Sequence, residues 1–126
     1  MNMRTPLSQV RGLGSAKEGT DHFWKQRLTG VANIPLTIFF VFLVIAMIGA
    51  DHARAAALIA SPLVAIILLM MIVSGLYHMR LGMQTIIEDY VPAEGMKIAL
   101  VMANTFFTVA IGVACIFAVL KISFGG

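Results

Sequence analysis

The chain has 126 residues, of which 60% are hydrophobic and only 12% carry a charged side chain, and its net charge is +3. A soluble domain of this length has about twice that share of charged residues, so the composition excludes a small water-soluble protein. The positive charge does not indicate nucleic-acid binding, because the basic residues flank apolar segments instead of clustering with aromatic residues on one polar face.

The first part of the chain is polar. Residues 1 to about 18 contain several glycines and show no apolar periodicity, which predicts an extended or partly disordered arm. Residues 21–27 (DHFWKQR) then combine aromatic and cationic side chains directly before an apolar stretch. Side chains of this kind settle at a bilayer surface, so we expect Phe23 and Trp24 to act as interfacial anchors.

Three long windows without any charged residue follow. They cover residues 28–50, 55–79 and 98–120, which are 23, 25 and 23 residues long. A helix needs about 20 apolar residues to cross a hydrocarbon layer about 30 Å thick. We therefore predict an all-α integral membrane protein, with 1–126 as a single domain. Its transmembrane helices are expected at approximately 28–50, 58–80 and 98–120.

The first window is not expected to be a cleaved signal, since it is longer than a secretory apolar region and no cleavage site follows it. Five of the nine basic residues precede it and two lie between the second and third windows, against two on the other side. Positively charged loops stay in the cytoplasm. We therefore expect residues 1–27 to be a cytoplasmic arm with an interfacial segment, and the C-terminus to be periplasmic. Acidic Glu18 and Asp21 argue against a mitochondrial transit peptide and favour the bacterial inner membrane.

Two prolines mark the expected helices. Pro35 lies near the start of the first window, where it indicates either the first helical turn or a mild kink,. Ser61 followed by Pro62 predicts a hydroxyl cap and a proline at the first helical position, although residues 55–60 could extend that helix outward,. Residues 51–54 are expected to form a short external turn.

One histidine, His78, lies inside the second window. At helical spacing Ser74 and Gly82 lie one turn to either side of it, so the imidazole projects from a face with little side-chain volume,. Such a slot suits a flat ligand, and imidazole is a common axial ligand of haem iron, with Ser74 as a candidate partner for the other ring nitrogen. A structural role remains open, because small faces also serve close packing and His78 could simply hydrogen-bond to a neighbouring helix.

Asp89 and Tyr90 come eleven and twelve residues after His78, just before Val91 and Pro92 end the segment,. If the helix is unbroken, Asp89 points the same way as His78 and lies about 16 Å further along. A phenol beside a carboxylate suits the carbonyl oxygen of a quinone, as hydrogen-bond donor and proton holder. The alternative is an aromatic-belt tyrosine next to a helix-ending acid.

The third window carries a stripe of small and weakly polar residues at helical spacing, which predicts a contact with a neighbouring helix and not a ligand set. The stripe consists of Asn104, Thr108, Gly112 and Cys115.

The pattern His78-x3-Gly82-x6-Asp89-Tyr90 resembles the signature of the hydrophobic membrane anchor of succinate dehydrogenase, the D subunit of succinate:quinone oxidoreductase (respiratory complex II). The similarity extends over the whole chain, with a short arm, three helices and an external C-terminus. It implies a bundle that binds haem b together with a second membrane anchor subunit, which supplies the other axial ligand. It also implies His78 as the haem ligand, Tyr90 as the ubiquinone hydrogen-bonding tyrosine and Asp89 as the acid beside it.

Residues 23–27 look like the family's Phe-x3-Arg, which implies that Arg27 lies near a haem propionate, with Arg80 as a further candidate. A cation at Arg27 could equally bind lipid phosphates. Ser74 and Gly82 would border the haem.

The chain has neither a flavin fingerprint nor a cysteine set for iron–sulfur clusters, so a flavoprotein subunit and an iron–sulfur subunit would oxidise succinate and pass on electrons. The alternatives are an anchor of a fumarate reductase and a non-redox membrane scaffold or assembly subunit.

Overall fold

The computed structural model describes residues 5–12 and 18–125. Throughout these two ranges the regular structure is α-helical, with no strand. The helices are α1 (Pro6–Val10), α2 (Glu18–Met47), α3 (His52–Ala60), α4 (Pro62–Tyr90) and α5 (Glu94–Ser123). Helices α2, α4 and α5 are long and apolar enough to cross a membrane. This confirms the all-α class and the three membrane helices.

The short helix α1 corrects the expectation of an extended arm. Thr5 caps it, since the backbone N–H of Ser8 donates to the Thr5 hydroxyl oxygen at 3.2 Å, and Pro6 occupies the first turn. A cap and a proline can start one helical turn without any apolar periodicity, which is why the pattern did not predict it. The rest of the predicted arm, residues 1–4 and 13–17, lies outside the described residues.

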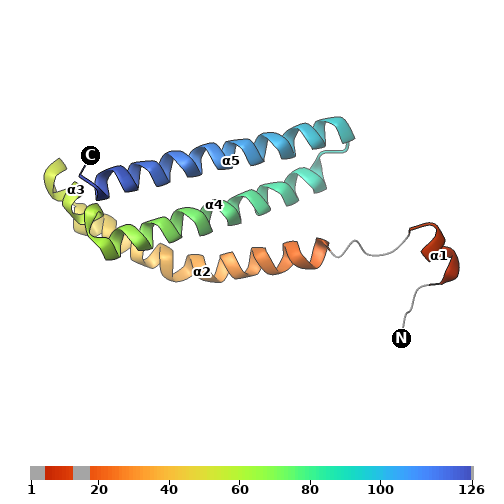
Figure 1. Ribbon diagram of the computed structural model, residues 1–126, viewed down its shortest axis with the longest axis horizontal. Helices are drawn as coiled ribbons and strands as arrows, with labels where there is room; N and C mark the ends of the chain where they lie inside the picture. The colour runs from red at the N-terminus through yellow and green to blue at the C-terminus, as the bar shows by residue number, and fades with distance from the viewer. Residues whose placement is uncertain (1–4, 13–17, 126) are drawn as a thin grey trace.

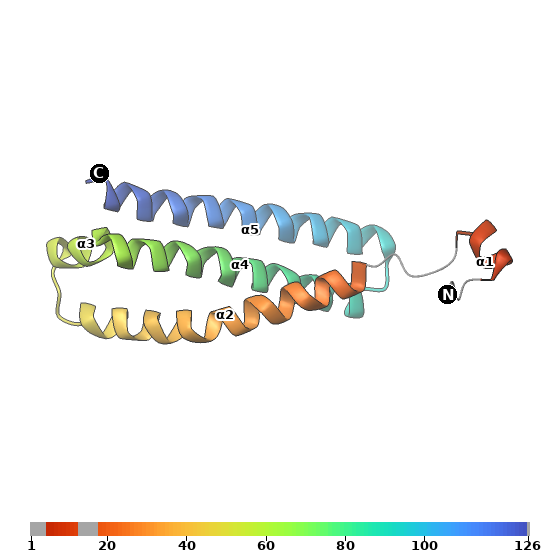
Figure 2. The same cartoon turned by 60° about the horizontal axis from the view of Figure 1, so that its bottom comes forward.

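Helix α2 begins well before the first apolar window and includes the interfacial segment 21–27. Pro35 therefore lies inside the helix, and the alternative that it marks the first turn is wrong. A proline within a helix cannot donate to the carbonyl four residues earlier and bends the axis. Helix α2 does change direction near its middle (Figure 2), as the kink alternative predicted.

Residues 52–60 form a helix of their own, and not a turn followed by an extension of α4. The side chain of Asp51 accepts a hydrogen bond from the Arg54 backbone N–H at 2.8 Å and so caps α3,. Ser61 then has a ψ of 127°, outside the helical range, because the following proline disfavours that range,. Helix α4 starts at Pro62 as predicted, but the Ser61 hydroxyl makes no cap hydrogen bond, so that part of the prediction is wrong.

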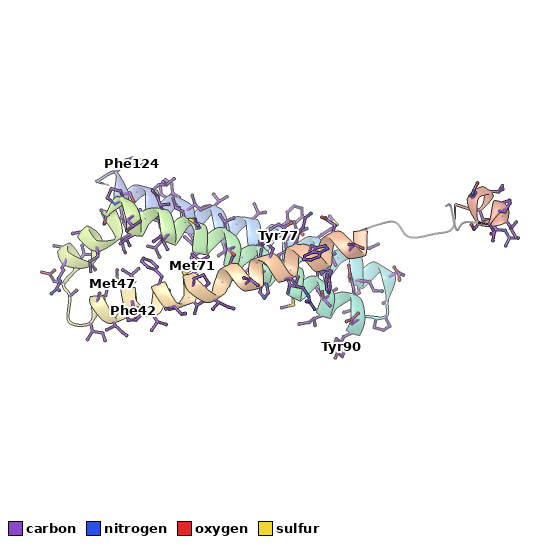
Figure 3. The ribbon with its side chains drawn as sticks, turned by 90° about the horizontal axis from the view of Figure 1, so that it is seen from below. Phe42, Met47, Met71, Tyr77, Tyr90 and Phe124 are labelled. Carbon is purple, nitrogen blue, oxygen red and sulfur yellow. The ribbon has the colours of Figure 1, made fainter. Side chains whose placement is uncertain are left out.

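Helix α4 lies between α2 and α5 and contacts both (Figure 1). We call the end of the bundle that bears α3 and the C-terminus the α3 end, and the opposite end the Tyr90 end. The buried core cluster consists of Leu43, Ala65, Leu68 and Val119. Met47 and Met71 pack against this cluster (Figure 3). Most large apolar side chains are exposed, as expected for a chain surrounded by lipid and by other membrane helices.

The contact between α4 and α5 confirms the predicted stripe at Asn104, Thr108 and Gly112, whereas the place of Cys115 in it stays a prediction. The Asn104 side-chain amide donates to the backbone oxygen of Arg80 at 3.0 Å, and Thr108 is buried. A Cβ atom on Gly112 would lie only 3.2 Å from Cδ1 of Leu76, so this glycine lets the two helices approach closely.

Helices α4 and α5 have 29 and 30 residues, about 44 Å at 1.5 Å per residue. This exceeds a hydrocarbon layer of about 30 Å, so some turns project beyond it. Most acidic and basic side chains of these two helices lie in the last turns of α4 and the first turns of α5, with Lys121 alone at the opposite end of α5. This distribution indicates that the Tyr90 end projects further. The boundaries at 28–50, 58–80 and 98–120 within the single domain stay predictions.

Candidate functional site

His78 lies at a contact between α2 and α4. Its ring nitrogen Nδ1 is 3.2 Å from the backbone oxygen of Gln26 and 3.1 Å from the hydroxyl oxygen of Thr29. A carbonyl oxygen can only accept a hydrogen bond, so the contact with Gln26 assigns the proton to Nδ1. Nε2 then keeps its lone pair. In the part of the chain that the structure describes, Nε2 has no hydrogen-bond partner.

The Thr29 hydroxyl supports this tautomer. It donates to the backbone oxygen of Lys25 at 2.8 Å within α2, which leaves its oxygen free to accept from His78. Both neighbours of Nδ1 are therefore acceptors. The imidazole is held in one orientation from α2, and Nε2 is the nitrogen that can bind something else.

Glycines create the room for this arrangement. A Cβ atom on Gly30 would lie 3.3 Å from Cε1 of His78, and one on Gly82 would lie 3.4 Å from Nε2 of Gln26. Any side chain at Gly30 would push against the imidazole. Gly82, expected to border a ligand slot, lies against the side-chain amide of Gln26 within this chain.

No hydrogen bond joins Ser74 to His78. The Ser74 hydroxyl donates to the side-chain oxygen of Asn33 on α2 at 2.8 Å. The expectation that Ser74 satisfies the second ring nitrogen is therefore wrong, because α2 approaches closely at Gly30 and offers nearer acceptors. We call this set of contacts the polar seam: Gln26, Thr29 and Asn33 of α2 with Ser74 and His78 of α4.

The seam continues toward the Tyr90 end with two buried polar atoms. Nε2 of His22 and Oε1 of Gln26 have no hydrogen-bond partner among the described residues. Buried polar atoms are nearly always paired, so each is expected to contact water or a bound group. His22, Gln26, Gly30 and Asn33 follow one another at helical spacing. This spacing could have identified the face of α2 that holds His78, but the first helix was expected to start only at residue 28.

A groove of about 670 Å³ runs beside the seam between α2 and α4. Its walls are mostly apolar, and its polar side chains are Thr29, Ser74 and Tyr77. This volume is in the range of small-molecule sites. Ser74 thus lines a real groove, although its hydroxyl is already engaged.

The two arginines expected near a haem propionate, Arg27 and Arg80, have different surroundings. Arg27 is exposed, and its guanidinium carbon lies 4.3 Å from the centre of the Phe23 ring, one helical turn away,. The guanidinium of Arg80 is directed to α5, where its Nε donates to the Thr105 hydroxyl at 3.2 Å. Arg80 therefore lies away from the polar seam, whereas Arg27 lies on the same stretch of α2 as the residues that hold His78.

Asp89 and Tyr90 lie in the last turn of α4, which is unbroken from Pro62 onward. This places Asp89 about 16 Å along the axis from His78, as the spacing predicted. Tyr90 is 80% exposed and projects outward from the end of the bundle (Figure 3). Neighbouring Glu88 accepts a hydrogen bond from the Gln84 side chain at 2.8 Å, whereas Asp89 and Tyr90 are open to a partner or ligand.

Within residues 5–12 and 18–125, no group of three or more histidine, cysteine or acidic residues could hold a metal ion. By itself, His78 can supply a single nitrogen ligand. A metal at this position would therefore need its other ligands from a cofactor and from another chain.

Comparisons with known proteins agree over the length of the chain. The family model described as "Succinate dehydrogenase/Fumarate reductase transmembrane subunit" matches residues 1–112. The chain is 30% identical over 125 residues to the succinate dehydrogenase hydrophobic membrane anchor subunit of Paracoccus denitrificans, covering 99% of this chain and 96% of that protein. It is 30% identical over 118 residues to the subunit of the same name from Rickettsia bellii, covering 94% of each. No solved structure matches the chain significantly.

Proposed function

Because the chain belongs to the succinate dehydrogenase/fumarate reductase transmembrane subunit family, we propose that it is the membrane anchor of a succinate:ubiquinone oxidoreductase. In this proposal it binds haem b jointly with a second anchor subunit and contributes to the ubiquinone reduction site. The observation that carries the proposal is the position of the His78 imidazole, whose Nδ1 lies 3.2 Å from the backbone oxygen of Gln26, while Nε2 has no hydrogen-bond partner among the described residues.

The residues of the polar seam fit an axial haem ligand. A ligating histidine almost always donates its other ring N–H to a carbonyl, carboxylate or water, and Gln26 and Thr29 meet this requirement for His78. Haem b, when bound, would accept and release single electrons. The second axial ligand would come from the partner anchor subunit, with Ser74 and Gly82 near the proposed haem.

Arg27 is the candidate for a haem propionate. Its guanidinium is exposed, stacks on Phe23 and lies next to Gln26 in α2, so it can offer paired N–H groups to a carboxylate. A lipid phosphate is the alternative partner.

Asp89 and Tyr90 would serve the quinone. The Tyr90 phenol can donate a hydrogen bond to a quinone carbonyl oxygen, and the Asp89 carboxylate can hold or pass on a proton. Both lie at the projecting end of α4, where water can supply the protons that quinone reduction consumes. The iron–sulfur subunit would dock at this end, and succinate would be oxidised on the flavoprotein subunit.

The proposed function is tested by a reduced-minus-oxidised optical spectrum of the purified complex. We expect the bands of a b-type haem. Their absence would favour a non-redox scaffold or assembly subunit. The matching family also includes fumarate reductase subunits, and a preference of the complex for low-potential menaquinone over ubiquinone would favour that alternative.

We further propose that the Tyr90 end faces the cytoplasm of a bacterium and the α3 end the periplasm, because most basic residues lie on the Tyr90 side,. In a Cys115→Ser background, Ala53→Cys in α3 should react with a membrane-impermeant thiol reagent on intact spheroplasts. Ala93→Cys, between α4 and α5, should react only after permeabilisation. Both positions are exposed, so the opposite labelling pattern would contradict the proposed orientation.

Replacing Thr29 with valine should raise the haem reduction potential, since it removes one of the two acceptors of the Nδ1 proton at nearly constant volume. A neutral hydrogen bond contributes about 0.5–1.5 kcal/mol, which corresponds to about 20–65 mV in a one-electron couple. Redox titration of the purified complex measures the shift. Thr37→Val, an exposed position further along α2, is the control, and equal potentials in the two variants would show that Thr29 does not act on His78.

A further inference from the structure

A second groove lies between α4 and α5, where Arg80 contacts Thr105. It has a volume of about 380 Å³ and is lined by α4 from Ile72 to Arg80 and by α5 from Thr105 to Ile116. Thr105 and Ile116 are eleven positions apart in one helix, so the groove is about 16 Å long. One leaflet of a hydrocarbon layer is about 15 Å thick, and the groove therefore matches the depth of one leaflet.

The groove is polar only at the end nearer Tyr90. There Arg80 donates through Nε to Thr105, which fixes the guanidinium and leaves its terminal N–H groups available. Tyr77, one turn earlier in α4, lines both this end of the groove and the groove between α2 and α4. Arg80 comes directly after the apolar window 55–79, and an arginine at such a position lies at headgroup level in membrane helices.

Arg80 is partly buried and has no acidic partner among the described residues. The two ion pairs found there lie within α2 and at the start of α5. A partly buried cation at membrane depth is costly unless an anion joins it. The charge of Arg80 therefore calls for an anionic group that the described part of the chain does not provide.

The remainder of the groove is apolar and accessible from its α5 rim. Val109 and Val113 on this rim are 57% and 63% exposed. The hollow exists because Gly112 has no side chain, and a Cβ atom there would crowd Leu76. A transmembrane helix, about 10 Å in diameter, is too wide for a groove of this volume, whereas an acyl chain is not.

We propose that this Arg80 groove binds a phospholipid with an anionic headgroup, such as phosphatidylglycerol, from the leaflet at the Tyr90 end. The phosphate lies against the guanidinium of Arg80, and one acyl chain follows the apolar wall toward Ile116. The groove contains no carboxylate to receive a choline group, so it discriminates against zwitterionic phosphatidylcholine. This proposal does not depend on haem or quinone binding.

The test uses the purified, delipidated complex with all its subunits. It is titrated with phosphatidylglycerol or phosphatidylcholine of equal chain length, and native mass spectrometry counts the lipids bound. Arg80→Gln should weaken phosphatidylglycerol binding about fivefold, the effect of one cation near a membrane surface. It should weaken phosphatidylcholine binding less, because the choline cation already offsets the charge of its phosphate beside Arg80. Lys97→Gln is the matched control, because Lys97 also lies toward the Tyr90 end of the bundle, in α5, but pairs with Glu94.

A second pair of variants tests the apolar wall. Val113→Phe fills the groove from its exposed rim and should weaken binding of both lipids. Ala114→Phe, which is exposed and outside the groove, should not.

Inorganic phosphate should not displace the lipid, because phosphate leaves the apolar wall of the groove empty. Full displacement would overturn the proposal in favour of a simple anion site. Equal phosphatidylglycerol binding in wild type and Arg80→Gln would also overturn it. Loss of a partner subunit in Val113→Phe without a change in bound lipid would identify the groove as a subunit contact instead.

Discussion

Replacement of His78 by leucine is expected to remove the low-spin spectrum of haem b from the assembled complex, or to leave the complex without haem. The variant deletes the one nitrogen that this proposal assigns to the iron, and leucine cannot replace it as a ligand. A five-coordinate haem changes spin state, so optical and electron paramagnetic resonance spectra of the purified complex measure the effect directly. His52→Leu in α3, at the other end of the bundle, is the matched control and should keep the wild-type spectrum.

Leucine is a suitable replacement because it removes the ligand and changes the packing little. It is apolar and similar in size to histidine, so α2 and α4 can still approach each other at Gly30. Loss of the hydrogen bonds to Gln26 and Thr29 should cost about 1–2 kcal/mol, less than the packing of three long helices provides. Assembly is checked by co-purification of the other subunits. Bis-histidine low-spin bands at wild-type intensity in the assembled variant would show that the ligand lies elsewhere.

The second large effect is expected at Tyr90. Tyr90→Phe should lower kcat/KM for ubiquinone reduction about two- to tenfold, the equivalent of a neutral hydrogen bond of about 0.5–1.5 kcal/mol. Succinate oxidation with a soluble artificial acceptor should stay at the wild-type rate, because that reaction does not use the membrane site. Tyr90 is 80% exposed in this chain, and a surface substitution of this kind changes stability by less than about 0.5 kcal/mol.

The neighbouring acids provide a matched comparison for the same site. Asp89→Asn should also lower ubiquinone reduction, through loss of the charge that holds a proton. Glu88→Gln should have little effect, because Glu88 already accepts a hydrogen bond from Gln84 in its own helix. Wild-type ubiquinone reduction by Tyr90→Phe at subsaturating quinone would mean that the phenol does not bind the quinone carbonyl.

The sequence predicted the class of this protein because crossing a membrane is decided by local composition. Each charge-free window is long enough to span hydrocarbon on its own, whatever lies beside it. The start of α4 at Pro62 and the α5 stripe around Asn104 and Gly112 were predictable for the same reason, since both depend on residues close together in the chain. The spacing from His78 to Asp89 and Tyr90 is likewise a property of one unbroken helix.

The helical segments that the charge-free windows did not predict also depend on residues close together in the chain, but those residues are polar. Helix α1 depends on the cap at Thr5, α3 on the cap at Asp51, and the early start of α2 on a charged stretch that is helical outside the apolar window. Hydropathy detects segments that are buried in lipid. It does not detect helices that lie at the edge of the lipid layer.

The surroundings of His78 were decided only by the tertiary structure. Ser74, one turn away on the same helix, was the partner that the sequence indicated, yet the imidazole is held by Gln26 and Thr29, about fifty positions earlier. That contact depends on how α2 and α4 are rotated and how closely they approach at Gly30, and helix–helix packing sets both. The sequence by itself therefore determined that His78 lies in a membrane helix, and packing determined which of its two nitrogens is hydrogen-bonded to α2.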